Sequence, residues 1–363
     1  MKRGQTFFKL FAITLLIALS SACDKDEDPK PDQRPDLSTE GVYILNSGKL
    51  DSNNASLSYF NPKTQILSTD VFQQQNDKKL GDTGQDMLIY GAKMYVAVYQ
   101  SNIIYVLDKE GNILNSQSPQ REGIAQKPRA FAAHKGKVYV SLFDGYLAKI
   151  DTATMMIEQQ VKVGRNPEQI AIANNKIYVA NSGGMDYPNY DQTVSVVDIN
   201  SFEVSKTIDV VSNPTSIIAD AQGNVYVKSS GNYGEIPSAF QKIDSKTDQI
   251  SVLEGINVAN MSLYNDKLYI VSSEYDANWN QIVSFQIFDT KTDKLISENF
   301  ISDGTKIEKP QSISVDSSTG NIYISTSDYI NSGDMYIISP EGKLIHKFDT
   351  GGLNPIGAYF VAN

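Results

Sequence analysis

The sequence is poor in the residues that most often carry catalysis and metal binding. Its 363 residues include one cysteine, Cys23, and two histidines, His134 and His346. A lone cysteine has no disulfide partner, and no spacing of cysteine and histidine matches a zinc or haem site. Loop carboxylates such as Asp144 and Glu235 could pair as acid and base or bind Ca²⁺, but such residues are usually only solvated. We therefore expect no enzymatic activity, no cofactor and no metal.

An excess of positive charge is also missing. The chain has 32 Lys and Arg against 42 Asp and Glu, which gives a formal net charge of −10. Nucleic-acid binding depends on a basic surface that neutralises phosphates. The acidic balance therefore argues against a nucleic-acid partner.

Long hydrophobic runs are limited to one short segment near the N-terminus. Three basic residues accompany an apolar run from Leu10 to Leu19, which is too short for a stable membrane-spanning helix. Small residues and then Cys23 follow, and this arrangement resembles a bacterial lipoprotein signal, with Ser20 at a place where such motifs usually carry Leu. The resemblance implies that residues 1–22 are a signal peptide and that Cys23 is lipidated. An ordinary secretory signal with an incidental cysteine is the alternative.

The composition of residues 23–40 predicts a tether. Five charged residues, Asp24 to Asp28, are followed by Pro29, Pro31 and Pro35, and such a composition buries no apolar area and stays extended. The acidic run resembles the surface-export signal of Bacteroidota lipoproteins, although a plain charged linker is the alternative. We therefore expect a domain anchored by lipid to the outer membrane and exposed at the cell surface.

The rest of the chain repeats one short motif. A tyrosine inside a β-branched segment, as in Lys176-Ile177-Tyr178-Val179, recurs at spacings of roughly 39 to 54 residues. The strand-B tyrosines, as we call them, are Tyr43, Tyr95, Tyr139, Tyr178, Tyr226, Tyr269 and Tyr323. A period in this range with β-forming residues is typical of stacked or radial repeats. We expect these rings to pack between neighbouring sheets.

One repeat unit is clearest between Asn166 and Val210. It predicts four antiparallel strands, A to D, over 168–173, 176–181, 193–198 and 203–210. Asn174-Asn175 is a tight-turn signal. In other units a residue pair ending in Pro opens strand A, and an Asp that can cap its own turn ends strand C.

The two ends of the chain are complementary. The segment after Gly41 is a strand B without a preceding strand A, and Pro355 to Val361 is a strand A with nothing after it. Pairing them would close a ring and remove open sheet edges. The sequence thus predicts an all-β fold, a seven-bladed β-propeller of four-stranded antiparallel blades over residues 41–363. A linear β-solenoid is the alternative.

Propeller geometry places the B–C and D–A loops on one face, which we call the B–C face. In six consecutive blades a B–C loop carries an aromatic residue beside Asn, Gln, Asp or Glu, whereas the A–B and C–D connections are nearly all tight turns. Aromatic rings and amides suit ligand binding, although the rings could instead fold back to cap the blades. The predicted ligand-binding residues are Tyr99, Gln100, Asn102, Phe143, Asp144, Tyr146, Tyr187, Asn189, Tyr190, Asn232, Tyr233, Tyr275, Asn278, Trp279 and Tyr329.

The recurring Asn-Pro, Lys-x-Tyr-Val and apolar-Asp elements resemble the YncE-like seven-bladed propellers. The opening Val42 to Gly48, with Leu80-Gly81-Asp82 and Met94 to Asn102, resembles propeller lipoproteins of gut Bacteroidota that carry a domain of unknown function. One branch of these is the BtuG-type lipoproteins. That resemblance implies capture of a corrinoid, vitamin B12, and its transfer to a TonB-dependent barrel of the outer membrane.

Two other functions remain open from the sequence. A surface protein that binds glycans would use the same aromatic side chains. A protein-interaction or adhesion module would bind its partner through the same face. The motifs that carry the resemblance specify the fold better than the ligand.

Overall fold

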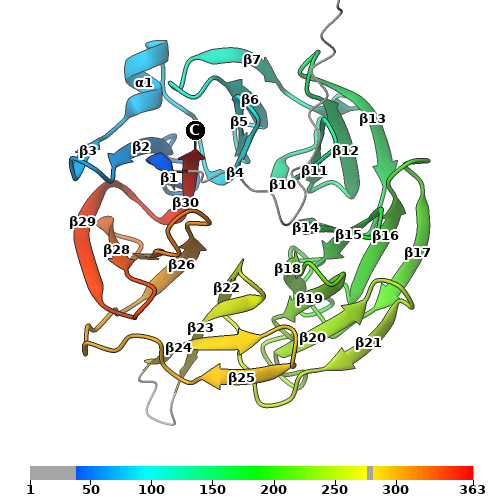
Figure 1. Cartoon of the computed structure of the whole chain (residues 1–363). Helices are drawn as coiled ribbons and strands as arrows, with labels where there is room; N and C mark the ends of the chain where they lie inside the picture. The colour runs from blue at the N-terminus through cyan, green and yellow to red at the C-terminus, as the bar shows by residue number, and fades with distance from the viewer. Residues whose placement is uncertain (1–37, 276–280, 363) are drawn as a thin grey trace, which may run out of the picture.

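The structure, a computed structural model, describes residues 38–275 and 281–362. Seven four-stranded antiparallel sheets, the blades, stand around a common axis (Figure 1). The innermost strand of each blade is strand A and the outermost is strand D. The predicted seven-bladed propeller is confirmed.

The strand bounds, from the inner to the outer edge of each blade, are as follows. Blade 1 contains β30 (Pro355–Ala362), β1 (Thr39–Asn46), β2 (Ser56–Asn61) and β3 (Ile66–Ser68); blade 2 contains β4 (Gly84–Tyr90), β5 (Lys93–Val98), β6 (Ile103–Leu107) and β7 (Ile113–Gln117); blade 3 contains β10 (Pro128–His134), β11 (Lys137–Leu142), β12 (Tyr146–Asp151) and β13 (Met156–Lys162); blade 4 contains β14 (Pro167–Ala173), β15 (Lys176–Asn181), β16 (Thr193–Asp198) and β17 (Val204–Asp209). Blade 5 contains β18 (Pro214–Ala219), β19 (Asn224–Ser229), β20 (Ala239–Asp244) and β21 (Gln249–Val252); blade 6 contains β22 (Asn260–Tyr264), β23 (Lys267–Tyr275), β24 (Gln281–Asp289) and β25 (Lys294–Ser297); blade 7 contains β26 (Pro310–Val315), β27 (Ile322–Thr326), β28 (Ser332–Ile338) and β29 (Leu344–Leu353).

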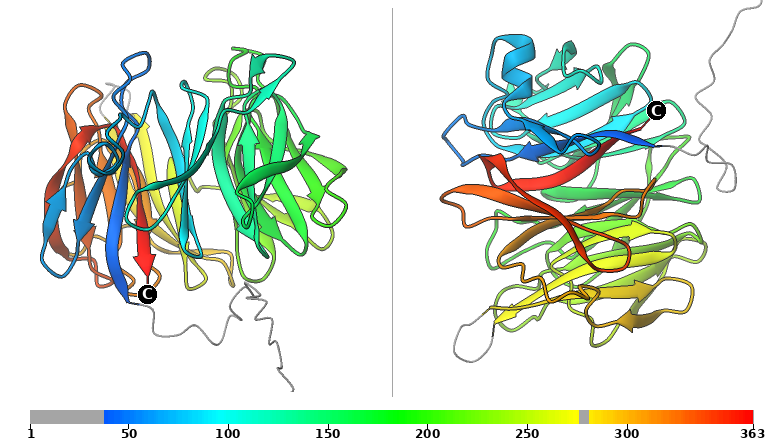
Figure 2. Two further views of the ribbon diagram at one scale, coloured as in Figure 1. Left: turned by 90° about the horizontal axis from the view of Figure 1, so that it is seen from above. Right: turned by 60° about the vertical axis from the view of Figure 1, so that its left-hand side comes forward.

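The two ends of the propeller meet in blade 1. The last strand, β30, pairs antiparallel with the first, β1, in a register that places Tyr43 opposite Tyr359 and Ile44 opposite Ala358. Figure 2 shows the red C-terminal strand lying against the blue N-terminal one. The predicted closure is confirmed, and blade 1 is built from both ends of the chain.

The strand-B tyrosines form the contacts between blades. All seven are buried, with side chains at most 6% exposed. The hydroxyl of Tyr178 donates to Asp248 Oδ1 of the next blade at 3.1 Å, and that of Tyr43 donates to the carbonyl of Lys109 in its neighbour at 2.9 Å. Burial raises the pKa of Tyr178 well above its usual value. These rings are core residues, as the sequence predicts.

The predicted turn chemistry is also present. Asn174 and Asn175 have φ of 48° and 57°, the left-handed pair that a tight two-residue hairpin turn requires. At the end of β16, Asp198 Oδ1 accepts hydrogen bonds from the amides of Asn200 and Ser201, each at 2.9 Å. The same capping holds for Asp108, Asp151, Asp244 and Asp289.

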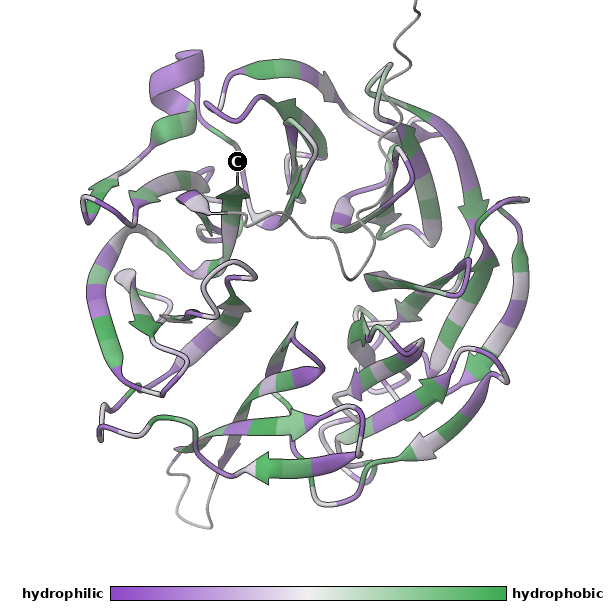
Figure 3. Cartoon of the chain, in the orientation of Figure 1, coloured by the Kyte–Doolittle hydropathy of each residue, from purple (hydrophilic) through white to green (hydrophobic). Residues whose placement is uncertain are grey.

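Two short elements are not predicted from the sequence. Helix α1 (Val71–Asn76) and the hairpin of β8 (Gln120–Arg121) and β9 (Ile124–Ala125) lie in connections after blades 1 and 2. Figure 3 shows that α1 is hydrophobic only at its start. There Phe72 is buried against Tyr105, with ring centroids 4.9 Å apart. Six residues are too few to show helical periodicity.

In the part of the chain that the structure describes, no helix has both the length and the apolar character needed to cross a membrane.

Ring closure predicts a large effect of truncation. Removing residues 355–363 would expose the edge of β1 and leave blade 1 without its inner strand, so we expect a loss of more than about 5 kcal/mol in the free energy of unfolding. Thermal unfolding followed by circular dichroism measures this. A synthetic peptide of residues 355–362 added in trans should restore part of the melting temperature. An unchanged melting temperature of the truncated chain would contradict the closure.

Candidate functional site

The B–C face is held together by one repeated contact. In five blades the residue before the first proline of strand A accepts, through its carbonyl, the amide of the first residue of the B–C loop. We call this the pre-proline contact. It joins Asn354 to Ser47, Lys127 to Phe143, Asn166 to Ser182, Asn213 to Ser230 and Lys309 to Ser327, at 2.8–3.1 Å. D–A and B–C loops therefore lie side by side on one face, as the geometry of the repeat predicts.

The first aromatic cluster bridges blades 2 and 3. The rings of Tyr99 and Phe143 meet edge to face with centroids 5.5 Å apart. The Arg129 guanidinium lies 4.7 Å from the Phe143 centroid and 5.4 Å from that of Tyr99. Lys127 Nζ lies 5.0 Å from the Tyr99 ring and donates to Gln100 Oε1 at 2.6 Å. Cations thus hold these half-buried rings in place.

The second aromatic cluster bridges blades 4 and 5. Tyr190 contacts Tyr187 and Tyr233, with centroid distances of 6.1 Å and 6.0 Å. Tyr187 is 68% exposed and Tyr233 is 71% exposed. Arg165 supports the loop by pairing with Asp186 and donating to the carbonyl of Asn189. Within the described part of the chain, two large rings are thus mainly exposed to solvent, which is what a binding surface requires.

Several predicted residues are engaged within their own loops. Asn102 is buried; its amide donates to the Pro119 carbonyl at 2.9 Å and accepts from the Lys127 amide at 2.8 Å. Asn232 Oδ1 accepts the amides of Gly234 and Ile236. Both side chains shape their loops. Asn102 has little capacity left for a ligand, whereas only the oxygen of Asn232 is engaged by these bonds.

The remaining predicted residues are spread around the face. Asp144 is exposed and accepts from Gln126 at 2.9 Å. The guanidinium carbon of Arg121 lies 4.5 Å from the centroid of the Tyr146 ring. Tyr329 is 63% exposed and donates to Gln311 at 2.9 Å. Tyr275 ends β23, and Asn278 and Trp279 lie outside the described residues.

The structure adds a cavity that the sequence did not predict. A space of about 430 Å³ lies on the ring axis and is lined by the innermost strand of every blade. Most of its lining residues stand near the start of strand A, so the cavity opens toward the B–C face. We call it the channel mouth. Its polar lining residues are Gln85, Asp86, Arg129, Glu168, Gln169, Thr215, Ser216, Lys228, Asn260, Ser314 and Tyr359.

The lining of the channel mouth is chemically asymmetric. Blades 2 to 5 supply its charged groups, and blades 6, 7 and 1 supply amide, hydroxyl, glycine and isoleucine residues. On the charged side Arg129 pairs with Glu168 and donates to Gln85 Oε1 at 2.6 Å, while Ser182 donates to Glu168 at 3.0 Å. Arg129 thus links the first aromatic cluster to the channel mouth.

Asp86 is a half-buried carboxylate of the channel mouth. Its oxygens accept from the amides of Phe131 and Met87, both at 2.8 Å, and from the Tyr359 hydroxyl at 3.1 Å. Burial nevertheless raises the pKa of Asp86 to about 6, because desolvation outweighs these three hydrogen bonds.

The charged residues of the channel mouth were not predicted from the sequence, although some of them show a partial signal there. Arg129 and Glu168 directly follow the first proline of strand A, a place where a charged side chain must face the ring axis or its neighbours. Their pairing joins two different blades, so it becomes visible only once the ring is closed. Lys228 interrupts an otherwise uncharged position of strand B.

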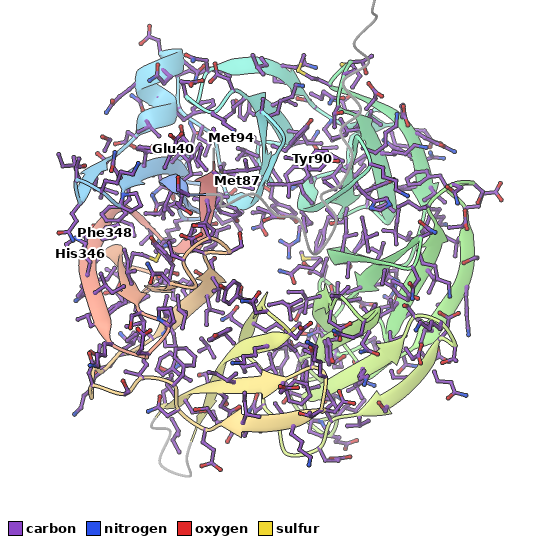
Figure 4. The ribbon with its side chains drawn as sticks, viewed as in Figure 1. Glu40, Met87, Tyr90, Met94, His346 and Phe348 are labelled. Carbon is purple, nitrogen blue, oxygen red and sulfur yellow. The ribbon has the colours of Figure 1, made fainter. Side chains whose placement is uncertain are left out.

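The two histidines lie away from this site. Figure 4 shows His346 at the outer rim beside Phe348, where the two rings lie 5.6 Å apart on β29. His134 ends β10 at the A–B turn, on the opposite face. Within residues 38–275 and 281–362, no group of three or more His, Cys, Asp or Glu side chains is arranged to hold a metal ion.

The raised pKa of Asp86 predicts a specific pH dependence. The folded-state pKa of about 6 lies above the reference value of 3.8, so the unfolded chain loses this proton first and the folded state is destabilised as pH rises from about 4 to 6. Asp86→Asn removes this loss. Relative to the parent, the free energy of unfolding of this variant should rise by roughly 3 kcal/mol when the pH is raised from 4 to 7. Urea unfolding at both pH values measures this difference. Parallel pH profiles for the two proteins would contradict this.

Comparison with known proteins identifies the fold but no activity. The chain is similar to Kuenenia stuttgartiensis hydrazine synthase (14% identity, 74% of this chain and 89% of that chain, TM-score 0.58) and to the computationally designed Ika8 protein (13%, 87% and 89%, TM-score 0.56). It is also similar to the WD40 domain of Neurospora crassa Pan2 (10%, 72% and 78%, TM-score 0.52). At these identities the likeness shows the propeller alone.

The search of curated proteins found no match. A family model described as "Domain of unknown function (DUF5074)" matches residues 40–251. This match spans more than half of the chain, from β1 of blade 1 to β21 of blade 5. The chain therefore belongs to the DUF5074 family.

Proposed function

We propose that this protein is a surface lipoprotein that captures a corrinoid on its B–C face and passes it to a TonB-dependent barrel of the outer membrane, without catalysing a reaction. The observation that carries the proposal is the pair of aromatic clusters beside the channel mouth. Together they offer flat apolar area and polar groups on one face, while the opposite face consists mainly of short turns.

The chemistry of a corrinoid suits this surface. Its macrocycle is broad and flat, and amide side chains project from its rim. Exposed Tyr187 and Tyr233 can lie against the flat surface at small cost in side-chain entropy. Exposed polar side chains nearby, such as Asn189 and Asp144, can hydrogen-bond to amides. The face is built on rigid blades, so little ordering is needed on binding.

Lipid anchoring at Cys23 would set how the face meets its partner. Strand β1 starts at Thr39, at the end of blade 1 where the A–B and C–D turns lie, so the anchored end of the chain enters opposite the B–C face. The segment from Cys23 to Thr39 spans at most about 55 Å when extended. That reach allows the propeller to turn its B–C face toward a barrel in the same membrane.

Calorimetric titration of residues 36–363 with cyanocobalamin tests the proposal. We expect near-stoichiometric binding that weakens about tenfold for each of Tyr187→Ala and Tyr233→Ala, because each removes a large apolar contact. Tyr264→Ala is the control on the opposite face, where half-buried Tyr264 ends β22 beside the A–B turn. Its affinity should stay within twofold of the parent.

Other outcomes would redirect the assignment. Tight binding that is insensitive to Tyr187 and Tyr233 would contradict the choice of surface. If no corrinoid binds, retention of the protein on a polysaccharide gel would favour a glycan-binding lipoprotein. Association with an outer-membrane protein without any small ligand would favour an interaction module.

A further inference from the structure

Lys228 stands at a position that the other six blades fill with uncharged residues. It lies two residues after the strand-B tyrosine of blade 5. The equivalent residues are Leu45, Ala97, Ser141, Ala180, Val271 and Ser325, and all six are fully buried. A lysine at such a place costs free energy of folding unless its charge is compensated. Its presence in just one of the seven blades therefore requires a specific explanation.

The surroundings of Lys228 satisfy its hydrogen bonds only in part. Its ammonium donates to Ser230 Oγ at 2.7 Å and to Thr215 Oγ1 at 3.1 Å. Both partners are neutral, and among the described residues no carboxylate lies within ion-pair distance of Nζ. Burial lowers the pKa of Lys228, and the negative charge of Glu168 partly opposes this. An ammonium has three N–H donors, so one remains for another partner.

The other charged groups of the channel mouth are already engaged. Glu168 is paired with Arg129, and Asp86 is held by two amides and by Tyr359. Among the described residues that line this cavity, Lys228 is the cation without an ion-pair partner. The Thr215 hydroxyl accepts a hydrogen bond from Lys228 and lies 3.4 Å from Ser230 Oγ, where either hydroxyl can be the donor. With Ser230 as the donor, the Thr215 hydrogen can point to a group in the cavity.

We propose that the channel mouth binds one singly charged oxyanion, a carboxylate or a phosphodiester, with Lys228 as its counter-charge and Thr215 as a second donor. The cavity of about 430 Å³ has room for such a group and for part of the molecule that carries it. The subsite rests on the proposed function in one respect, because complete corrinoids carry a phosphodiester in their nucleotide loop. The subsite would then bind the phosphodiester of the corrinoid's nucleotide loop, while the aromatic clusters contact the macrocycle.

The first arm of the test compares cyanocobalamin with dicyanocobinamide, which lacks the nucleotide loop and its phosphodiester. The parent protein should bind cyanocobalamin at least tenfold more tightly by calorimetry. Lys228→Met keeps an unbranched side chain that is one atom shorter and removes the charge. This variant should lose the preference while its affinity for dicyanocobinamide stays within twofold. Lys246→Met, the same change in the exposed C–D turn of the same blade, should leave the preference intact.

The second arm does not depend on corrinoids. Inorganic phosphate and acetate are titrated against the parent, Lys228→Met and Lys246→Met at constant ionic strength, with thermal unfolding as the readout. The parent and Lys246→Met should show a saturable rise in melting temperature, and Lys228→Met should not.

The two arms separate the two ideas. Absence of corrinoid binding together with a saturable, Lys228-dependent anion effect would reject the corrinoid and keep the subsite. Corrinoid binding with equal preference in the parent and in Lys228→Met would overturn the subsite and keep the proposed function. Absence of any Lys228-dependent anion effect in both arms would overturn the subsite outright.

Discussion

The structure depends on the pairing of β30 with β1. Seven similar sheets can bury their inner faces only if the last one meets the first, and here both ends of the chain contribute strands to blade 1. Stacking of Phe60 on Phe348, with centroids 4.4 Å apart, adds side-chain packing between blades 1 and 7. Closure covers the inner edge of β1 with β30 and fixes the axis on which the channel mouth lies.

Closure also explains why the long loops gather on one face. Because each strand A starts on the same side, the pre-proline contacts hold B–C and D–A loops together around the axis. The residues directly after the first prolines, such as Arg129 and Glu168, then converge from different blades and pair with each other. Aromatic rings from the loops surround this charged region, so that apolar and ionic groups meet on a rigid support.

Much of the fold was predictable because the same local sequence features recur in several blades. The strand-B tyrosines, the Asn174-Asn175 turn and the strand-ending Asp198 each follow from side-chain chemistry that acts over a few residues. The site was less predictable. Loop aromatics such as Tyr187 could be named from the sequence, but the engagement of the Asn102 amide by its own loop, and the meeting of Arg129 with Glu168, depend on contacts between distant segments. Lys228 breaks the pattern two residues after Tyr226, but its place in the lining of the channel mouth depends on the closed ring.

The central claim is that the B–C face around the channel mouth is the binding surface. Hydrogen–deuterium exchange of the whole protein with and without saturating cyanocobalamin tests it most directly, because it reports on every loop at once. The account predicts slower exchange in residues 182–192 and 230–238 and at the starts of the neighbouring inner strands, with the A–B turns unchanged. Protection confined to the A–B and C–D turns or the outer strands, or no protection anywhere, would contradict it.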